Sequence, residues 1–266
     1  MFKKFIVVLW IVLLADACAR VPITGRRQLN MLPESELTAI ALTNYKQFIH
    51  NNIVITGTTD AQKVHDIGLK IASAAQRYLK SHNESKRIRG YKWEFNLVQS
   101  KDINAWCMPG GKVVVYSGIL PVTKNEVGLA VVMSHEIAHA IARHGNERMS
   151  QGLLAEVGGL ALNLYLQQKP SQVNALFEQS YGLAVTLGAI LPFSRMQESE
   201  ADKMGLVFMA MAGYNPNEAV DFWQRMKGAT NNNVPAFLST HPSDEKRIEA
   251  IKQFMPTAMK YYKTNE

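Results

Sequence analysis

Two histidines and a glutamate stand close together in the middle of the chain, in the order His135-Glu136-Ile137-Ala138-His139. Residues four positions apart in an α-helix lie about 400° around its axis and roughly 6 Å along it, so both imidazoles project from one face. They are then close enough to bind one metal ion, with Glu136 beside them as a base and not a ligand. Such a glutamate can take a proton from an attacking water and pass it to a leaving amine. The pattern predicts metal-dependent amide hydrolysis.

A second group of acidic residues follows 60 residues later, in the segment 194–202, Ser-Arg-Met-Gln-Glu-Ser-Glu-Ala-Asp. A catalytic zinc needs three protein ligands and one open position. Glu198 and Asp202 are again four apart, so Glu198 can bind the metal while Asp202 hydrogen-bonds a ligating histidine. The alternative is an acidic helix N-terminus that suits the helix dipole. Taken alone, the segment favours this alternative.

The helix that carries the two histidines is predicted from its ends and its apolar residues. Thr123 and Glu126 have the spacing of a capping box, an apolar run continues to Arg143, and Gly145 is a plausible stop. The apolar run favours a buried helix over two solvated histidines on an ordinary one. His144 is expected off the metal-binding face, near the helix end.

A small sheet is predicted beside this helix. Apolar and polar residues alternate over 91–98, and 112–116 is a β-branched run introduced by the turn Pro109-Gly110-Gly111. Residues 103–106 are a third candidate strand. The other apolar patterns have helical spacing and predict helices at 34–49, 60–79, 153–168, 173–191, 194–212, 216–227 and 244–254. The predicted fold class is α+β and mostly helical.

The N-terminus has the pattern of an export signal. Lys3 and Lys4 precede an apolar run over residues 5–14, which is shorter than the roughly 20 residues that a membrane-spanning helix needs. Ala15 and Ala17 offer a signal-peptidase site, and the same stretch resembles a bacterial lipobox in which Cys18 becomes lipidated. We favour the lipoprotein, with a released protein and an uncleaved anchor as alternatives.

Length, charge and cysteine content narrow the remaining possibilities. The 266 residues carry a formal charge of +7, but Lys and Arg are scattered and form no stripe that would predict nucleic-acid binding. Two cysteines cannot form a disulfide framework. We therefore predict a signal peptide over 1–17, an anchor linker over 18–30 and one metallopeptidase domain over 31–266.

Four elements of the chain together resemble a known family. These are Asn104-Ala-Trp-Cys-Met-Pro-Gly-Gly111, the HExxH motif, the acidic segment 194–202 and Thr240-His241-Pro242. In this combination and order the chain resembles the HtpX-like and CAAX prenyl protease family of zinc metallopeptidases (peptidase family M48), as a small exported bacterial lipoprotein. The resemblance covers roughly residues 30–255 and implies a gluzincin-like domain with a small sheet beside the active-site helix.

The resemblance also implies roles for individual residues. According to the resemblance, one zinc ion per chain is bound by His135, His139 and Glu198. Glu136 is the catalytic base, and Asp202 supports the site. Its edge strand would bind an extended substrate, which we place at Gly110, Gly111, Lys112, Val113 and Val114.

Three further residues are each compatible with two interpretations. His241 would stabilise the oxyanion or occupy the open metal position, the alternative being a surface histidine that caps the next helix. Arg195 and Arg247 would orient carboxylates at the site, or form solvated salt bridges.

Together these features predict a zinc endopeptidase that cuts misfolded proteins of the cell envelope. We expect polypeptide substrates, no nucleic-acid partner, and a lipid anchor at Cys18 on a membrane surface of the periplasm, at the outer rather than the inner membrane. One alternative is an envelope chaperone or assembly factor with weak or latent proteolysis. Another is an integral-membrane protease that inserts the uncharged stretch 179–194. Manganese or cobalt could replace zinc in vitro.

Overall fold

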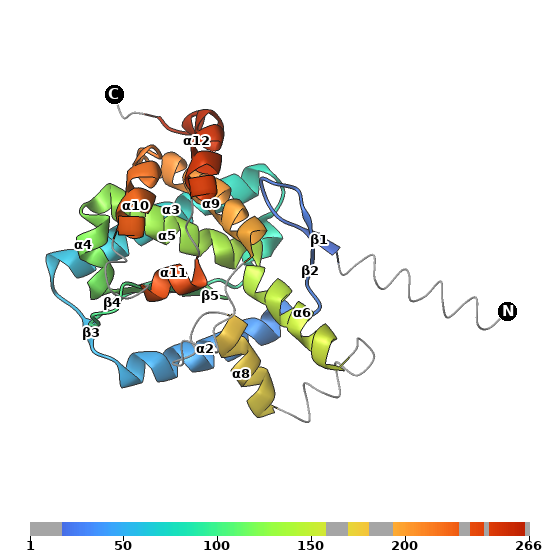
Figure 1. The fold of residues 1–266 in the computed structure, drawn as a ribbon. Helices are drawn as coiled ribbons and strands as arrows, with labels where there is room; N and C mark the ends of the chain where they lie inside the picture. The colour runs from blue at the N-terminus through green and yellow to red at the C-terminus, as the bar shows by residue number, and fades with distance from the viewer. Residues whose placement is uncertain (1–17, 158–169, 181–193, 229–234, 242–244, 264–266) are drawn as a thin grey trace.

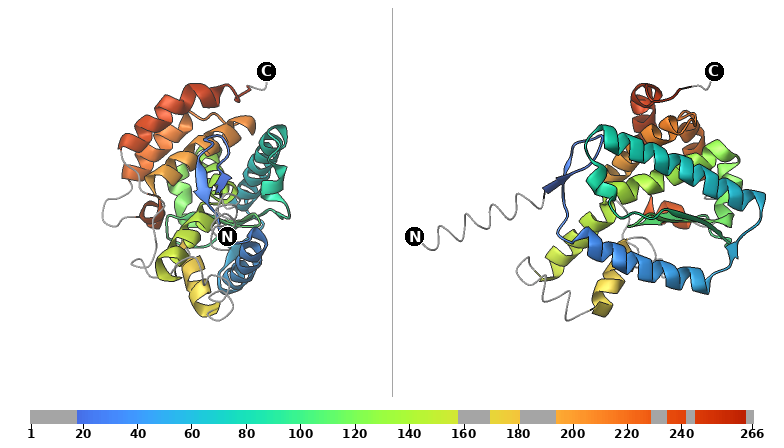
Figure 2. Two further views of the ribbon diagram at one scale, coloured as in Figure 1. Left: turned by 90° about the vertical axis from the view of Figure 1, so that its right-hand side faces the viewer. Right: turned by 180° about the vertical axis from the view of Figure 1, so that it is seen from behind.

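A small β-sheet lies at the centre of the protein between two layers of helices (Figures 1 and 2). The computed structural model describes residues 18–157, 170–180, 194–228, 235–241 and 245–263. One face of the sheet is covered by α2 (Glu34–Asn51), and the other by a group of helices that includes α3 (Thr59–Ser81) and α5 (Glu126–Ala142). The predicted fold class, mostly helical with a small sheet, is confirmed.

Most helices lie where their apolar spacing places them. The remaining described helices are α4 (Leu120–Thr123), α6 (His144–Val157), α8 (Pro170–Ser180), α9 (Arg195–Met211), α10 (Glu218–Gly228), α11 (Ala236–Thr240) and α12 (Glu245–Met259), with 3-10 turns at Ser85–Ile88 and Ser117–Ile119. The helices predicted at 34–49, 60–79 and 194–212 are confirmed with small shifts at their ends, whereas α12 continues past residue 254. In α3 the apolar residues three and four positions apart are the buried ones, as in an amphipathic helix.

The sheet contains β3 (Val54–Ile55), β4 (Glu94–Val98), β6 (Lys112–Tyr116) and β5 (Ala105–Met108), in that spatial order. β4 and β6 are parallel, with Phe95 opposite Val113. β5 and β6 are antiparallel, with Cys107 opposite Val113. The chain passes from β5 to β6 through Gly110 and Gly111, both of which have a φ of +84°, a backbone conformation that favours glycine.

The strand order corrects one prediction. β6 is hydrogen-bonded to β4 along one edge and to β5 along the other, so residues 111–116 are not the edge that could receive a substrate strand. That position belongs to β5, which pairs with β6 alone among the described strands. Alternating side chains identify a strand in sequence but do not specify its neighbours.

Side chains of the sheet alternate between two hydrophobic clusters. One face packs on α3 and α5 through Phe95, Leu97, Cys107, Val113 and Val115. The other packs on α2 through Trp106, Met108 and Val114. Because both faces are covered, β5 and β6 are buried along almost their whole length.

The active-site helix α5 begins and ends differently from the prediction. Its N-cap is Asn125, whose side-chain oxygen accepts a hydrogen bond of 2.8 Å from the Gly128 amide. Thr123 is instead the last residue of α4, so the predicted capping box is wrong. At the other end, Arg143 adopts a left-handed conformation and the chain turns directly into α6, which contains Gly145. Asn125, directly before Glu126, therefore caps the helix in place of the more distant Thr123.

Helix α9 lies along α5 and begins with a capping box formed by Ser194 and Gln197. The two helices approach closely at Gly205, where a Cβ atom would lie 3.1 Å from the backbone nitrogen of His135. Glycine permits this approach because it has no Cβ. The crossing brings the first turns of α9 against the histidines of α5.

The segment predicted as an anchor linker, residues 18–30, forms a β-hairpin that packs against the domain. It contains β1 (Cys18–Arg20) and β2 (Arg27–Leu29), with Cys18 opposite Leu29. Val21 is buried, and the Gln28 amide donates a 2.8 Å hydrogen bond to the carbonyl of Ala142. The hairpin is therefore attached to the end of α5.

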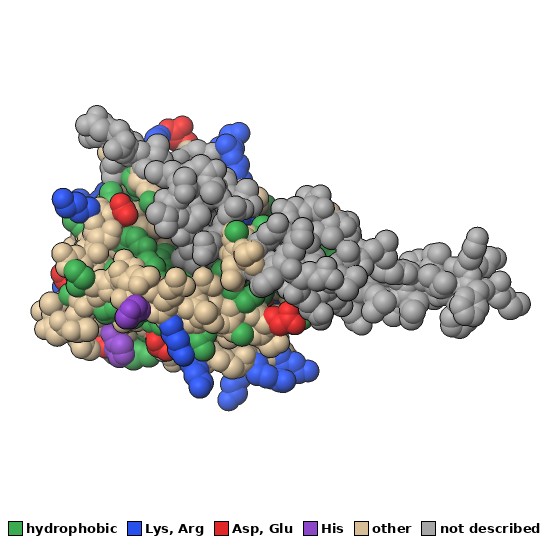
Figure 3. Space-filling view, turned by 90° about the horizontal axis from the view of Figure 1, so that it is seen from below, with side chains coloured by type: hydrophobic (Ala, Val, Ile, Leu, Met, Phe, Trp, Pro, Cys, Tyr) green, Lys and Arg blue, Asp and Glu red, His purple; other side chains and the backbone are tan. Residues whose placement is uncertain are grey.

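Several predictions concern residues outside the described part of the chain. These are the signal peptide at 1–17, the later part of the helix at 153–168, and most of the uncharged stretch at 179–194. In the described part, none of the helices combines the length and the hydrophobicity that crossing a membrane requires. On the face seen from below, the Lys and Arg side chains lie at separate places, so the positive charge is dispersed there (Figure 3).

Candidate metal centre

His135 and His139 project from α5 into the same buried space. Their Nε2 atoms lie 3.0 Å apart, and the two residues are 2% and 4% exposed. Helix α5 is buried from Gly128 to Ala142, with Ser134, His135, Glu136 and His139 as the polar side chains of that stretch, and the two imidazoles contact one another.

Helix α9 supplies two carboxylates to the histidines. Glu198 Oε1 lies 3.3 Å from His139 Nε2, and Asp202 Oδ1 lies 3.0 Å from His135 Nδ1. Burial by itself would raise the pKa of Glu198, but the positive charges of His241 and Arg247 hold it well below the usual range. Glu198 is therefore ionised and faces the ring atoms directly, while Asp202 contacts the opposite nitrogen of His135.

His241 approaches the group from the C-terminal part of the chain. It follows α11, and its Nδ1 lies 2.9 Å from Glu198 Oε1 and 3.3 Å from His135 Nε2. It is 2% exposed, so the alternative of a surface histidine is wrong. The amide of Phe237 in α11 donates a hydrogen bond to the carbonyl of Ile103, just before β5, which fixes this segment over the site.

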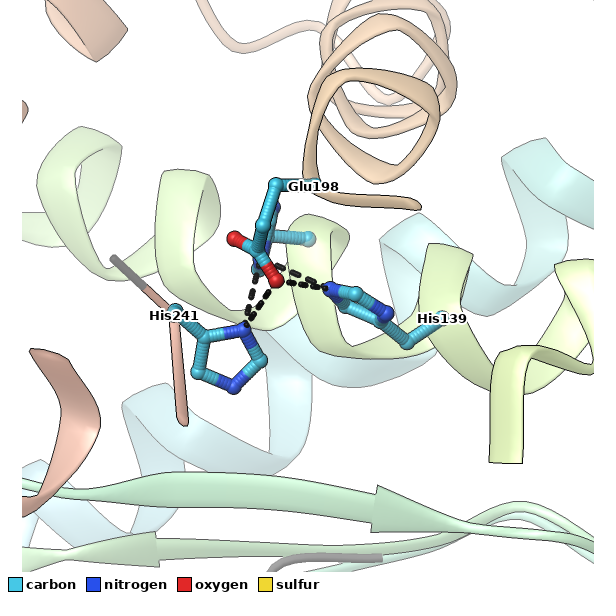
Figure 4. A group of neighbouring side chains, drawn as sticks. His139, Glu198 and His241 are labelled. Atoms are coloured by element: carbon cyan, nitrogen blue, oxygen red, sulfur yellow. Dashed lines mark hydrogen bonds and ion pairs between the residues drawn. The ribbon is translucent and has the colours of Figure 1, made fainter. Parts of the chain in front are cut away.

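These four side chains have the spacing of a metal site. One donor atom from each of His135, His139, Glu198 and His241 lies within 4.8 Å of all the others (Figure 4). Four of the six pairs among His135 Nε2, His139 Nε2, Glu198 Oε1 and His241 Nδ1 are separated by 3.0, 3.3, 2.9 and 3.3 Å. A tetrahedral ion with bonds of about 2.0–2.1 Å needs ligands about 3.3–3.4 Å apart. The donor types, imidazole and carboxylate, also suit zinc, so the residues present fit such an ion.

Glu136 lies beside this group without belonging to it. Its Oε1 lies 3.3 Å from His241 Nε2 and accepts no hydrogen bond within the described part of the chain. Burial raises its pKa. Glu136 also lines a cavity together with residues 104–107. These residues include most of the edge strand β5. A buried carboxylate with a free oxygen and raised basicity can take up a proton beside this cavity.

Cys107 lines the same cavity but is not a nucleophile. Burial raises the pKa of its thiol well above the usual range, with a further contribution from the negative charge of Glu136. A thiol in this environment stays protonated.

The two arginines proposed for the site differ in position. Arg247 is buried and donates two hydrogen bonds of 2.8 Å to Asp202, while its Nη1 lies 2.7 Å from Glu198 Oε2. Its guanidinium also stacks 3.4 Å from the centre of the Trp223 ring. Arg195 is exposed at the first turn of α9. Arg247 thus holds the carboxylates of Asp202 and Glu198 in place.

The residues predicted to bind substrate do not line this cavity. Gly110 and Gly111 form the turn before β6, and the Lys112 ammonium pairs with Glu94. Val113 and Val114 are completely buried in the two faces of the sheet. Substrate contact by these five residues therefore does not fit the structure, because β5 lies between β6 and the cavity.

A second buried network, which the sequence patterns did not predict, lies behind His139. His144 is completely buried, and its Nδ1 lies 2.9 Å from His139 Nδ1. A position five residues later would leave the metal-binding face of a continuous helix, but the break at Arg143 turns His144 back. On its other side His144 contacts Glu200, and Glu200 in turn accepts a hydrogen bond from Arg26.

A buried helix carrying HExxH, with a glutamate from a second helix and a small sheet beside it, defines a gluzincin-like metallopeptidase, which acts on polypeptides. Residues 59–255 match the model of peptidase family M48. The chain belongs to this family, and the resemblance stated from the sequence is confirmed.

Three similar proteins illustrate the range of the family. The mitochondrial metalloendopeptidase OMA1 of Schizosaccharomyces pombe is 33% identical over 92% of this chain and 69% of its own length. The enzyme of the same name from Saccharomyces cerevisiae is 33% identical over 77% of this chain and 58% of its own length. The beta-barrel assembly-enhancing protease of Escherichia coli is 30% identical over 59% of this chain and 33% of its own length. The chain thus spans about a third to two thirds of these relatives.

Proposed function

We propose that the protein is a zinc-dependent endopeptidase in which His135, His139 and Glu198 hold the ion. The observation that carries this proposal is the convergence of their donor atoms with that of His241, all within 4.8 Å of one another in a buried group. A divalent ion held there would supply a Lewis acid that polarises a peptide carbonyl and lowers the pKa of water.

The chain's own residues account for the other requirements of hydrolysis. Glu136 is placed to take the proton of the attacking water and return it to the leaving amine, because it lines the cavity and its Oε1 accepts no hydrogen bond within the described part of the chain. Asp202 fixes the ring of His135 through Nδ1, which leaves Nε2 directed at the donor group. Arg247 keeps Asp202 ionised and in place.

We assign substrate binding to β5 in place of β6. An extended polypeptide that added to the edge of β5 that no described strand occupies would run along the cavity that Glu136 and His139 line. Backbone pairing of this kind depends little on the side chains of the substrate, so it suits unfolded or misfolded proteins of varied sequence. This supports a role in protein quality control.

The cellular setting rests on the N-terminal sequence. The charged start, the short apolar run and Cys18 support export and a lipid anchor at a membrane of the cell envelope. The name of the Escherichia coli relative connects that protein with β-barrel assembly, which is compatible with an envelope role here. An envelope chaperone with latent proteolysis is the second candidate, favoured by the position of His241 among the donors.

Metal content and cleavage of an unfolded protein test the proposal together. The purified full chain should contain one zinc per molecule and cleave casein, lose cleavage with a chelator, and regain it when zinc is returned. A folded chain that binds no zinc would overturn the metal assignment. Stoichiometric zinc without cleavage would favour the chaperone.

His241→Ala should separate the latent from the active state. In this structure His241 Nδ1 takes a place among the donors, whereas a catalytic site needs an open position. The variant should retain zinc through the other three ligands and cleave casein several-fold faster than wild type. The controls are His65→Ala, a substitution at an exposed histidine, and zinc analysis of both variants. Slower cleavage with full zinc content would instead support oxyanion stabilisation by His241.

A further inference from the structure

Arg26 lies between two buried glutamates that come from different helices. Its Nε and Nη2 donate hydrogen bonds of 2.7 and 2.9 Å to Glu200 of α9, and its Nη1 and Nη2 donate bonds of 2.6 and 2.7 Å to Glu147 of α6. Thr24 donates to Glu200 and Gln197 donates to Glu147. The loop between β1 and β2 is therefore attached to both helices by one guanidinium.

The network continues from Glu200 to the metal centre. Glu200 Oε2 lies 3.1 Å from His144 Nε2, and His144 Nδ1 lies 2.9 Å from His139 Nδ1. His139 Nε2, the other ring nitrogen, faces Glu198 and His135. Glu200 and His144 are 4% and 0% exposed, so water does not compete for these contacts.

Chemistry assigns the protons along this path. If His139 binds a metal through the lone pair of Nε2, its neutral ring carries the proton on Nδ1 and donates it to His144 Nδ1. His144 then carries its own proton on Nε2 and donates it to the carboxylate of Glu200. Glu200 is a suitable acceptor, because its carboxylate oxygens already accept hydrogen bonds from Arg26 and Thr24.

The other histidine of the motif has a similar support. Asp202 lies behind His135 Nδ1, and Arg247 holds Asp202 with two hydrogen bonds of 2.8 Å. Each ring is thus backed by a carboxylate that an arginine fixes. The difference is that His144 is inserted between Glu200 and His139, so that the support begins in the N-terminal hairpin.

We propose that Arg26 is a positioning residue for His139, acting through Glu200 and His144, and that the hairpin of residues 18–29 is thereby part of the metal centre. The inference rests on the proposed metal-binding role of His139. Without Arg26, two buried carboxylates lose their common counter-charge. Glu200, no longer held by the guanidinium, can turn away from His144, and His144 then no longer fixes the orientation and tautomer that direct His139 Nε2 at the metal.

Zinc affinity of the full chain, measured by competition with a chromogenic chelator, tests this directly. Wild type must bind zinc, or the proposed function itself fails. Arg26→Gln should bind zinc about 10–100-fold more weakly, the usual cost of losing an outer partner of a ligand. Arg27→Gln, a substitution at the exposed neighbour in the same hairpin, should bind as wild type does. Equal affinity of folded Arg26→Gln and wild type would overturn the inference.

A pair of substitutions at His144 distinguishes an effect on zinc binding from a simple loss of folding. His144→Leu removes the acceptor for His139 Nδ1, whereas His144→Asn keeps an acceptor oxygen near the same position. His144→Leu should weaken zinc binding more than His144→Asn, and the visible spectrum of the cobalt-loaded protein should change in the same order. Circular dichroism of the metal-free variants identifies those that fold. Wild-type zinc affinity in a folded His144→Leu variant would contradict the inference even if Arg26→Gln did not fold.

Discussion

Glu136→Gln should retain zinc and lose nearly all peptidase activity. Glutamine has almost the shape of glutamate, and Glu136 lies beside the donor group without contributing an atom to it. Its free oxygen is the base that the reaction needs, and burial raises its pKa toward the working range. Because general acid–base catalysis contributes about 10²–10⁴-fold, we expect kcat for casein or a quenched peptide to fall by that factor.

Zinc analysis and steady-state kinetics on the same preparations check this result. Glu126→Gln is a matched control, since Glu126 is exposed in the first turn of the same helix and should show wild-type values in both measurements. A Glu136→Gln enzyme that cleaves at the wild-type rate would show that another group takes the proton. A variant that has lost its zinc would place Glu136 among the ligands.

Glu198→Ala should have the second large effect, on metal binding itself. Glu198 is the carboxylate among the four donors, and the positively charged Arg247 lies 2.7 Å from its Oε2. Its removal takes away a ligand and leaves Arg247 near the remaining imidazoles. We expect zinc affinity to fall by more than the roughly 100-fold that loss of an outer partner costs, and cleavage to disappear at ordinary zinc concentrations.

Competition with a chelator measures this loss, and Glu249→Ala on the exposed face of α12 provides the control. Unfolding of the metal-free variants by urea shows whether the substitution affects the fold independently of zinc. Wild-type affinity in Glu198→Ala would exclude Glu198 as a ligand. The acidic segment would then have only its role at the N-terminus of α9.

Local spacing in the sequence predicted much of the site. His135 and His139 occupy one helical face, and the four-residue spacing of Glu198 and Asp202 indicates that both face α5. Most long helices also follow directly from their apolar periodicity. These features depend on residues a few positions apart, where the geometry of a single helix fixes the relation between side chains.

The tertiary structure decided the features that join distant parts of the chain. It placed β5 at the sheet edge beside the site, brought His241 to residues more than 40 positions away, and attached Arg26 to Glu200 across 174 positions. None of these contacts leaves a periodic signal, because which surfaces meet depends on the packing of the whole core. The sequence by itself therefore predicted the proposed ligand pair and the peptidase chemistry, and the three-dimensional fold determined the proposed substrate edge and the contacts that support the candidate metal centre.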